Sequence, residues 1–177
     1  MVRIVVTCVL LCSLAACGGG STGRFSADPR QYLLTIDEMV SSDFTVSMAP
    51  ALTDATTASV SFARSVDFGT SNGPIAVIDA VQRFASTDAA HSSFAADASR
   101  LDAEKGEVVT STGALGDEAH ADSLVMTAPD GIQAVQITLE WRVSNVVVTL
   151  IVRGRYGGTR LDDALELAHR QTSTQLA

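Results

Sequence analysis

The chain of 177 residues is poor in aromatic side chains, in positive charge and in long apolar stretches. Aromatic residues make up 5%, too few and too scattered for a sugar-stacking platform. Lys and Arg number 12 against 20 Asp and Glu, and the net charge of −8 argues against binding to nucleic acid or anionic lipid headgroups. No apolar run approaches the ~20 residues of a membrane-spanning helix. Apolar residues still reach 46%, enough to build the core of one folded domain.

Cysteine is also scarce, and the three cysteines, Cys8, Cys12 and Cys17, all lie near the start of the chain. Residues 4–16 form a short apolar stretch behind Arg3, the only charged residue before position 24. As a helix this stretch would span roughly 20 Å, short of the ~30 Å core of a bilayer. A cationic start followed by a short apolar body is typical of a secretory signal peptide.

The end of this leader, Leu14-Ala15-Ala16-Cys17, resembles the lipobox of bacterial lipoprotein precursors. The resemblance implies cleavage before Cys17, a diacylglyceryl group on its thiol and acylation of the new amine. The alternative is an ordinary secretory cleavage with an incidental cysteine, but Leu14 stands where such a site has a small residue. We therefore expect a signal peptide at 1–16 and a lipid anchor at Cys17. The anchor would hold the protein in the cell membrane or outer membrane, facing the extracytoplasmic side.

The residues behind Cys17 indicate a tether and then a folded body. Residues 18–23 are rich in glycine and serine, a composition that behaves as flexible coil. The sequence predicts a lipidated cysteine and tether over 17–27 and a single globular extracytoplasmic domain over 28–177. No cysteine follows position 17, so no disulfide is expected in the body.

The body predicts helices and strands in both halves. Asp28 and Pro29 form a helix start, and Thr53 with Asp54 form a second one. The alternation of apolar and polar residues through 135–143 is the clearest strand pattern, and Ser144-Asn145 is a two-residue turn. Helices are expected over 28–40, 53–66 and 88–104 and after Thr159, and strands over 44–48, 75–84, 108–110, 123–127, 135–143 and 146–152.

Three of these strands follow one another through tight turns, at Pro129-Asp130-Gly131 and at Ser144-Asn145. Such an order makes an antiparallel meander. The strand over 146–152 is apolar on both faces, so it should be central. The predicted fold class is α+β, an antiparallel sheet with a C-terminal three-stranded meander and helices packed on one face.

Four segments, Tyr32–Asp37, Gly116–Ala119, Trp141-Arg142 and Asn145–Val148, come in an order that resembles a poorly characterised group of bacterial proteins. They are extracytoplasmic lipoproteins and sensor-type domains, common in actinobacteria, and include the extracellular domains of mycobacterial Ser/Thr kinases. This resemblance implies a location at the cell envelope and binding of a ligand or partner. It implies no reaction.

Residues that could carry chemistry are few. His91, His120 and His169 lack the i, i+4 spacing of a zinc-binding helix, and no G-x-S-x-G motif is present. The segment Gly116-Asp117-Glu118 could offer carboxylates to an acid catalyst or calcium, but a solvated turn explains it as well. Asp162-Asp163 fits a helix start. The sequence predicts no catalytic residue, no metal site and no cofactor.

Two functions remain open at this point, with an envelope hydrolase as a third that would need polar residues converging in a cleft. The first is a non-enzymatic module that binds a small ligand or an envelope protein. The second is a carrier of lipid or another apolar molecule, whose cavity would be lined by Trp141, Val146 and Val148. A large dry cavity between sheet and helices would favour the carrier. A filled core with a polar outer groove would favour the binding module.

Overall fold

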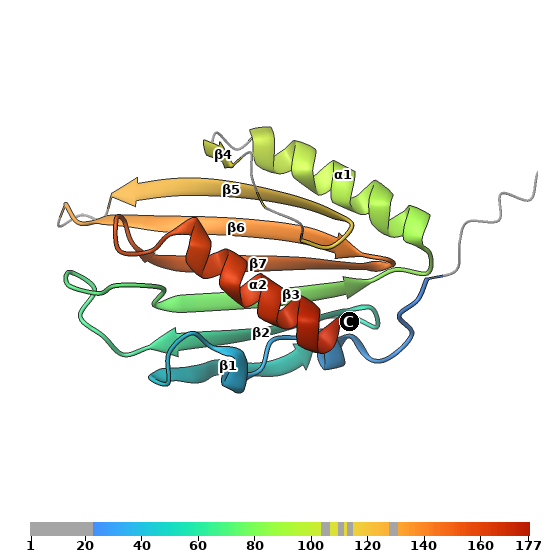
Figure 1. Ribbon diagram of the computed structural model, residues 1–177, viewed down its shortest axis with the longest axis horizontal. Coiled ribbons are helices and arrows are strands. Elements are labelled where there is room, and N and C mark those ends of the chain that lie inside the picture. Colours follow the sequence, from blue (N-terminus) through green and yellow to red (C-terminus); the bar gives the residue numbers. More distant parts are fainter. Residues whose placement is uncertain (1–22, 104–106, 110–111, 113–114, 128–130) are drawn as a thin grey trace, which may run out of the picture.

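The computed structural model describes residues 23–103, 107–109, 112, 115–127 and 131–177. Within these residues the chain forms one seven-stranded sheet, two α-helices and two short 3₁₀-helices (Figure 1). In chain order the elements are η1 (Pro29–Tyr32), η2 (Ile36–Glu38), β1 (Phe44–Leu52), β2 (Thr57–Arg64), β3 (Ala76–Arg83), α1 (Thr87–Ala103), β4 (Glu107–Val109), β5 (Glu118–Thr127), β6 (Gln133–Val143), β7 (Val146–Arg155) and α2 (Leu161–Gln175).

The sheet joins two meanders. Its strand order is β1-β2-β3-β7-β6-β5-β4, and every neighbouring pair is antiparallel. The α+β class and the C-terminal meander predicted from the sequence are confirmed, the meander being β5-β6-β7. β7 lies at the centre of the sheet, as its two apolar faces predicted. The Ser144-Asn145 turn joins β6 to β7, and Ser144 has the positive φ of 54° that tight hairpin turns require.

The pairing registers sort the side chains onto two faces, because directly opposed residues point to the same side and successive residues alternate. Phe62 opposes Val77, Val81 opposes Val148, and Trp141 opposes Val148. We call the face that carries these residues the dry face. The opposite face, with Thr57, Gln82, Val147 and Glu140, is called the polar face.

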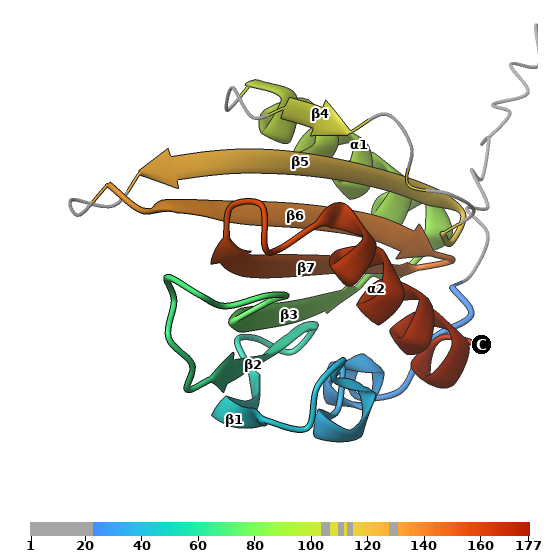
Figure 2. The ribbon, with the colours of Figure 1, turned by 60° about the vertical axis from the view of Figure 1, so that its left-hand side comes forward.

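Helices cover both faces. α2 and the two 3₁₀-helices pack on the dry face (Figures 1 and 2). These three form the helical layer expected on one face of the sheet. α1 lies on the polar face, where Ala90 and Phe94 pack against Val147 in a small separate cluster. α1 lies over β6, β7 and β5, and Val147 of β7 supplies the buried apolar contact on this face.

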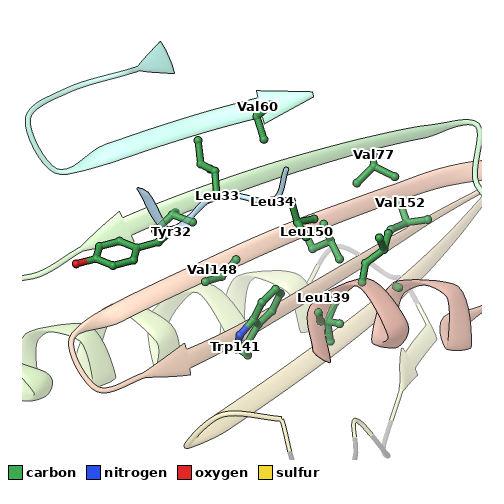
Figure 3. Packing of buried hydrophobic residues seen from close by; sticks show 14 of the residues in the cluster. Tyr32, Leu33, Leu34, Val60, Val77, Leu139, Trp141, Val148, Leu150 and Val152 are labelled. Carbon is green, nitrogen blue, oxygen red and sulfur yellow. The ribbon is translucent and has the colours of Figure 1, made fainter. Parts of the chain in front are cut away.

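The dry face carries the main core. Side chains from β2, β3, β6, β7 and η1 point toward one another in Figure 3. α2 closes this layer with Leu167 and Ala168, both fully buried. α2 is the helix expected after Thr159, and its N-cap is Arg160. The Thr159 hydroxyl instead donates to the Gly73 carbonyl at 2.9 Å.

The helix predicted over 53–66 is wrong, since this segment forms the β1–β2 turn and β2. Asp54 accepts hydrogen bonds from the backbone N–H groups of Thr56 and Thr57, which makes a tight turn rather than a helix cap. Ala58, Val60 and Phe62 are buried at a spacing of two residues. That period belongs to a strand, and it outweighs the cap-like Thr53-Asp54 pair.

The helix predicted over 28–40 is also replaced, by η1 and η2 with an extended stretch between them. Asp28 does accept the Arg30 N–H as the expected cap, at 2.9 Å. Leu33 and Leu34 are both buried, and the Leu34 N–H bonds to Asp79 rather than to a helical carbonyl. Two adjacent core residues and this tertiary hydrogen bond interrupt the helix.

The folded domain begins earlier than the predicted boundary at residue 28. Phe25 is buried in the core and meets the Tyr32 ring edge to face at 5.3 Å. Other predictions fit: α1 and β3 agree with the expected helix and strand to within one residue at each end. Cys17, the leader, residues 18–22 of the tether and Pro129-Asp130 lie outside the described residues.

Candidate functional site

The predicted pocket residues Trp141, Val146 and Val148 are brought together, but in the core. All three are fully buried on or beside the dry face. They line none of the three cavities described below. This corrects their expected role, because α2 and η1 fill the space above them with their own side chains.

A cleft on the polar face, beside α1, gathers the most polar groups. Its volume is about 160 Å³. Two rows of opposed residues form its floor: Thr57 opposes Gln82, and Glu140 opposes Thr149. Asp97 on α1 stands at its roof. The complete lining is Thr57, Ala80, Val81, Gln82, Asp97, Glu140, Val147 and Thr149.

Glu140 is the distinctive residue of this cleft. It is only 2% exposed, yet its carboxylate makes no hydrogen bond with any residue in the described part of the chain. Burial raises the pKa of this carboxyl to about 7, the negative charge of Asp97 adds to the rise, and Arg100 opposes it. Buried carboxylates normally have partners. Glu140 is therefore an acceptor held ready inside a small cavity.

The other groups around the cleft do not neutralise Glu140. Arg100 forms an ion pair with Asp97 on the same helix, with 3.6 Å between its Nε and the carboxylate oxygen. Thr57, Gln82 and Thr149 add hydroxyl and amide groups that accept or donate hydrogen bonds. Such a cleft can hold a proton, or it can receive a hydrogen-bond donor that carries positive charge.

Sequence reasoning missed Glu140. It sits at a polar position of the alternating strand over 135–143, a pattern that indicates a solvated face. One signal could have found it, because the neighbouring strand over 146–152 is apolar on both faces. A further element must pack on the second apolar face of that strand. That element is α1, and it also buries Glu140.

The Gly116-Asp117-Glu118 segment has a structural role. Asp117 accepts hydrogen bonds from Arg142 Nη1 at 3.0 Å and from the Ser144 N–H at 2.7 Å. Glu118 accepts from Arg142 Nε at 2.8 Å. We call Asp117, Glu118 and Arg142 the Arg142 cluster. Its carboxylates hold the β6–β7 hairpin against the start of β5.

The Arg142 cluster also reaches α1. Glu118 Oε1 lies 2.8 Å from His91 Nδ1 on that helix. Burial alone would raise the pKa of Glu118, but the hydrogen bonds from His91 and Arg142 outweigh it and lower the pKa. Gly116 is required here, because it has a φ of +61° and a side chain would come within 2.4 Å of the Arg142 carbonyl.

Asn145 performs a related task at the same hairpin. Its Oδ1 accepts the Phe25 N–H at 2.8 Å, and its Nδ2 donates to the carbonyls of Phe25 and Phe84. Gly23 approaches so closely that a Cβ there would lie 2.0 Å from Asn145 Cγ. Three of the four segments on which the family resemblance rests, Gly116–Ala119, Trp141-Arg142 and Asn145–Val148, thus meet at the β6–β7 turn, where they hold structure.

The remaining predicted residues stay apart. His169 is exposed on α2, and His120 is half-buried on β5 beside Glu140. Asp163 accepts the Arg160 N–H at 2.8 Å, in keeping with a helix start. Among the described residues, no group of three or more His, Cys, Asp or Glu side chains could hold a metal ion.

Two further cavities lie on the dry-face side. One, of about 210 Å³, lies at the start of α2, beside Tyr156 and Arg160. The other, of about 190 Å³, is an apolar hollow between η1 and β1, beside Ile36 and Val46. The described residues give no buried unpartnered carboxylate to either cavity, which separates them from the cleft beside α1.

Of the helices in the described ranges, none has the length and apolarity that crossing a membrane requires. Comparisons with known proteins found no matching family model, no matching curated protein and no matching solved structure. The function of the cleft is therefore inferred from its own residues.

Proposed function

We propose that this protein is a lipid-anchored module of the cell envelope that binds a small polar ligand without catalysis. The observation that carries the proposal is the polar cleft beside α1, with the buried and unpartnered Glu140 at its floor. The leader and its lipobox support the location. The cell membrane and the outer membrane both fit the lipobox.

The filled core favours this function over a carrier of apolar molecules. Trp141, Val146 and Val148 would line the cavity of a carrier, but each is fully buried among other side chains. α2 and η1 fill the space above these three residues with their own side chains, so the cavity expected of a carrier does not form around them. The cleft beside α1 lies on the polar face, on the other side of the sheet.

Binding without catalysis fits the arrangement of the cleft. Neither Thr57 nor Thr149 donates its hydroxyl to a base among the described residues, so no activated nucleophile stands beside Glu140. Activation of a hydroxyl requires a base within hydrogen-bond reach. Hydrogen-bond acceptors without a paired hydroxyl and base support recognition of a ligand.

The anchor is tested with Cys17→Ser in the full chain, expressed in a bacterial host that processes lipoproteins. Unchanged protein should incorporate labelled palmitate and enter the detergent phase on phase separation. The variant should lose both properties, because it lacks the thiol that receives the lipid. Label in the variant, or a mature N-terminus other than Cys17, would refute the anchor.

Ligand binding is tested on the full chain purified in detergent and exposed to a small-molecule extract, with native mass spectrometry as the readout. Ala80→Phe should fill the cleft and abolish the bound mass. Ala63→Phe is the matched control, since Ala63 is also half-buried on the polar face but does not line the cleft. A bound lipid in all three proteins would favour the carrier, and no bound mass in any would refute the proposal.

A further inference from the structure

We infer that the cleft beside α1 recognises its ligand through a protonated primary amine, which Glu140 receives at the floor. This inference rests on the proposed function and names the chemistry of the ligand. It follows from three features of the cleft: a buried carboxylate without an ion-pair partner, further hydrogen-bond acceptors in the lining, and a small volume.

The first feature is the unmet demand of Glu140. Glu140 is only 2% exposed, and no described residue donates a hydrogen bond to its carboxylate. A buried charge without a partner is costly, and a bound cation with N–H groups removes that cost. A neutral alcohol would supply a donor but no charge, and an anion would add repulsion.

The charged and titratable groups on the neighbouring elements form no ion pair with Glu140 among the described residues. α1 contributes Asp97 and Arg100, which pair with each other. β5 contributes His120, directly opposite Glu140. β7 and β3 contribute the uncharged Thr149 and Gln82. Arg100 attracts Glu140 only from a distance, and no residue in the described ranges forms an ion pair with the Glu140 carboxylate.

The second feature is the geometry of the acceptors. A primary ammonium group has three N–H donors. The carboxylates of Glu140 and Asp97, the hydroxyl of Thr149 and the amide oxygen of Gln82 all line the same cleft. Val147 and Ala80 offer apolar contact to a short alkyl chain. A quaternary ammonium has the charge but no N–H donors, so it should bind less well.

The third feature is size. The cleft has a volume of about 160 Å³. Pockets that enclose drug-sized ligands measure about 300–1,000 Å³. The cleft therefore admits a small free amine or the aminated end of a larger molecule, such as the headgroup of an aminated phospholipid. The two sources present the same ammonium chemistry.

Ethanolamine is the probe, titrated calorimetrically into the full chain in detergent at pH 8, with ethylene glycol and choline as matched compounds. We expect ethanolamine to bind and both others to bind at least about tenfold more weakly, because neither of them offers an N–H donor that carries positive charge. Glycerophosphoethanolamine separates the sources: tighter binding than ethanolamine indicates a headgroup, and weaker binding indicates a free amine.

Glu140→Gln should raise the Kd for ethanolamine at least about tenfold, since the amide keeps the shape and loses the charge. Glu166→Gln is the control, because Glu166 is an exposed glutamate on α2, on the far side of the sheet. Its Kd should match the unchanged protein. Asp97→Asn, at a half-exposed position, is a second test. It should raise the Kd for ethanolamine less than Glu140→Gln does.

Binding should also weaken as the pH falls from 8 to 5, because protonation removes the charge of Glu140. Equal binding of ethylene glycol and ethanolamine, or an unchanged Kd in both Glu140→Gln and Asp97→Asn, would overturn the amine inference. The proposed function would survive that result if Ala80→Phe still abolished a bound mass. If the unchanged protein carried no bound mass and gave no heat with ethanolamine, both the proposed function and the amine inference would be refuted.

Discussion

Each face of the sheet buries a carboxyl group whose pKa is raised, Asp79 on the dry face and Glu140 on the polar face. Burial raises the pKa of each to about 7. Asp79 Oδ2 accepts the Leu34 N–H at 2.8 Å and the Gln171 amide at 3.0 Å. Glu140 has no such donors among the described residues. The comparison teaches that burial alone does not make a site, and that the partners decide.

Asp79 shows what a structural carboxyl does. Gln171 on α2 also donates to the Tyr32 carbonyl at 2.8 Å. β3, α2 and the segment around η1 therefore meet at one buried hydrogen-bonded point. This point lies within a filled core, whereas Glu140 lies beside open space. The following predictions test this difference, from the largest expected effect to the smallest.

Trp141→Ala should lower the free energy of unfolding by about 3–5 kcal/mol, as truncation of a fully buried aromatic residue does. The reason is that Trp141 lies at the centre of the dry-face core. Phe94→Ala should cost less, because Phe94 belongs to the small cluster that seats α1. Urea denaturation measures both, and a larger loss in Phe94→Ala would reverse the assigned ranking of the two faces.

Asp79→Asn should make the protein more stable than the unchanged protein at pH 8. The folded-state pKa of Asp79 lies above its ordinary value of 3.8, so its contribution to stability is full below pH 4 and is lost as the pH rises through about 7. The neutral amide avoids that loss, with an expected gain of about 1–3 kcal/mol at pH 8. Denaturation at pH 4 and pH 8 measures it, and the gain should vanish at pH 4.

Glu140→Gln should show a similar gain at pH 8, because the contribution of Glu140 to stability is lost as the pH rises from about 4.5 to about 7. The two variants then separate when ethanolamine is added at pH 8. The amine should stabilise the unchanged protein and so reduce the apparent gain of Glu140→Gln, since ligand binds only the folded state that carries its site. Asp79→Asn should keep its full advantage. An equal response of both variants would mean that the faces do not differ as described.

Asn145→Ala should cost about 1–3 kcal/mol, because it leaves the buried backbone groups of Phe25 and Phe84 without their partner. Hydrogen exchange should rise first at the Phe25 amide and reach the strands of the sheet later. Ser92→Ala, at an exposed position on α1, is the comparison variant and should leave that amide unchanged. Simultaneous loss of protection across the sheet would contradict a local role.

Glu166→Gln should change stability by about 0.2–0.5 kcal/mol at most, the usual contribution of an exposed i, i+4 pair on a helix. Its partner Arg170 also donates to the Glu38 and Met39 carbonyls, so α2 stays docked without the ion pair. Thermal unfolding measures the change. A loss above 1 kcal/mol would mean that the pair organises the dry-face layer.

Most of the sheet could be predicted from the sequence, where local pattern and final burial agree. The alternation around Trp141 predicted β6, and the double apolar face of 146–152 predicted the central place of β7. The Thr53-Asp54 pair misled because the same residues that cap helices also make tight turns. The period of two at Ala58, Val60 and Phe62 was the stronger evidence.

The candidate site could not be predicted, because its character depends on a distant element. Glu140 is polar and lies at a position that alternation assigns to solvent, and only the packing of α1 buries it. Trp141, expected to line the cavity of a carrier, is buried in the core instead. The leader and Cys17 lie outside the described residues, so the anchor stays a prediction.

The attachment of Phe25 to Asn145 fixes where mechanical load enters the domain. A force applied upstream of Gly23 reaches the β6–β7 hairpin through the hydrogen bonds that join Arg24 to Ser144 and Phe25 to Asn145. That hairpin is braced by Arg142 and continues into the central strand β7. A domain suspended from this point would pass the force into the middle of its sheet rather than into an edge strand.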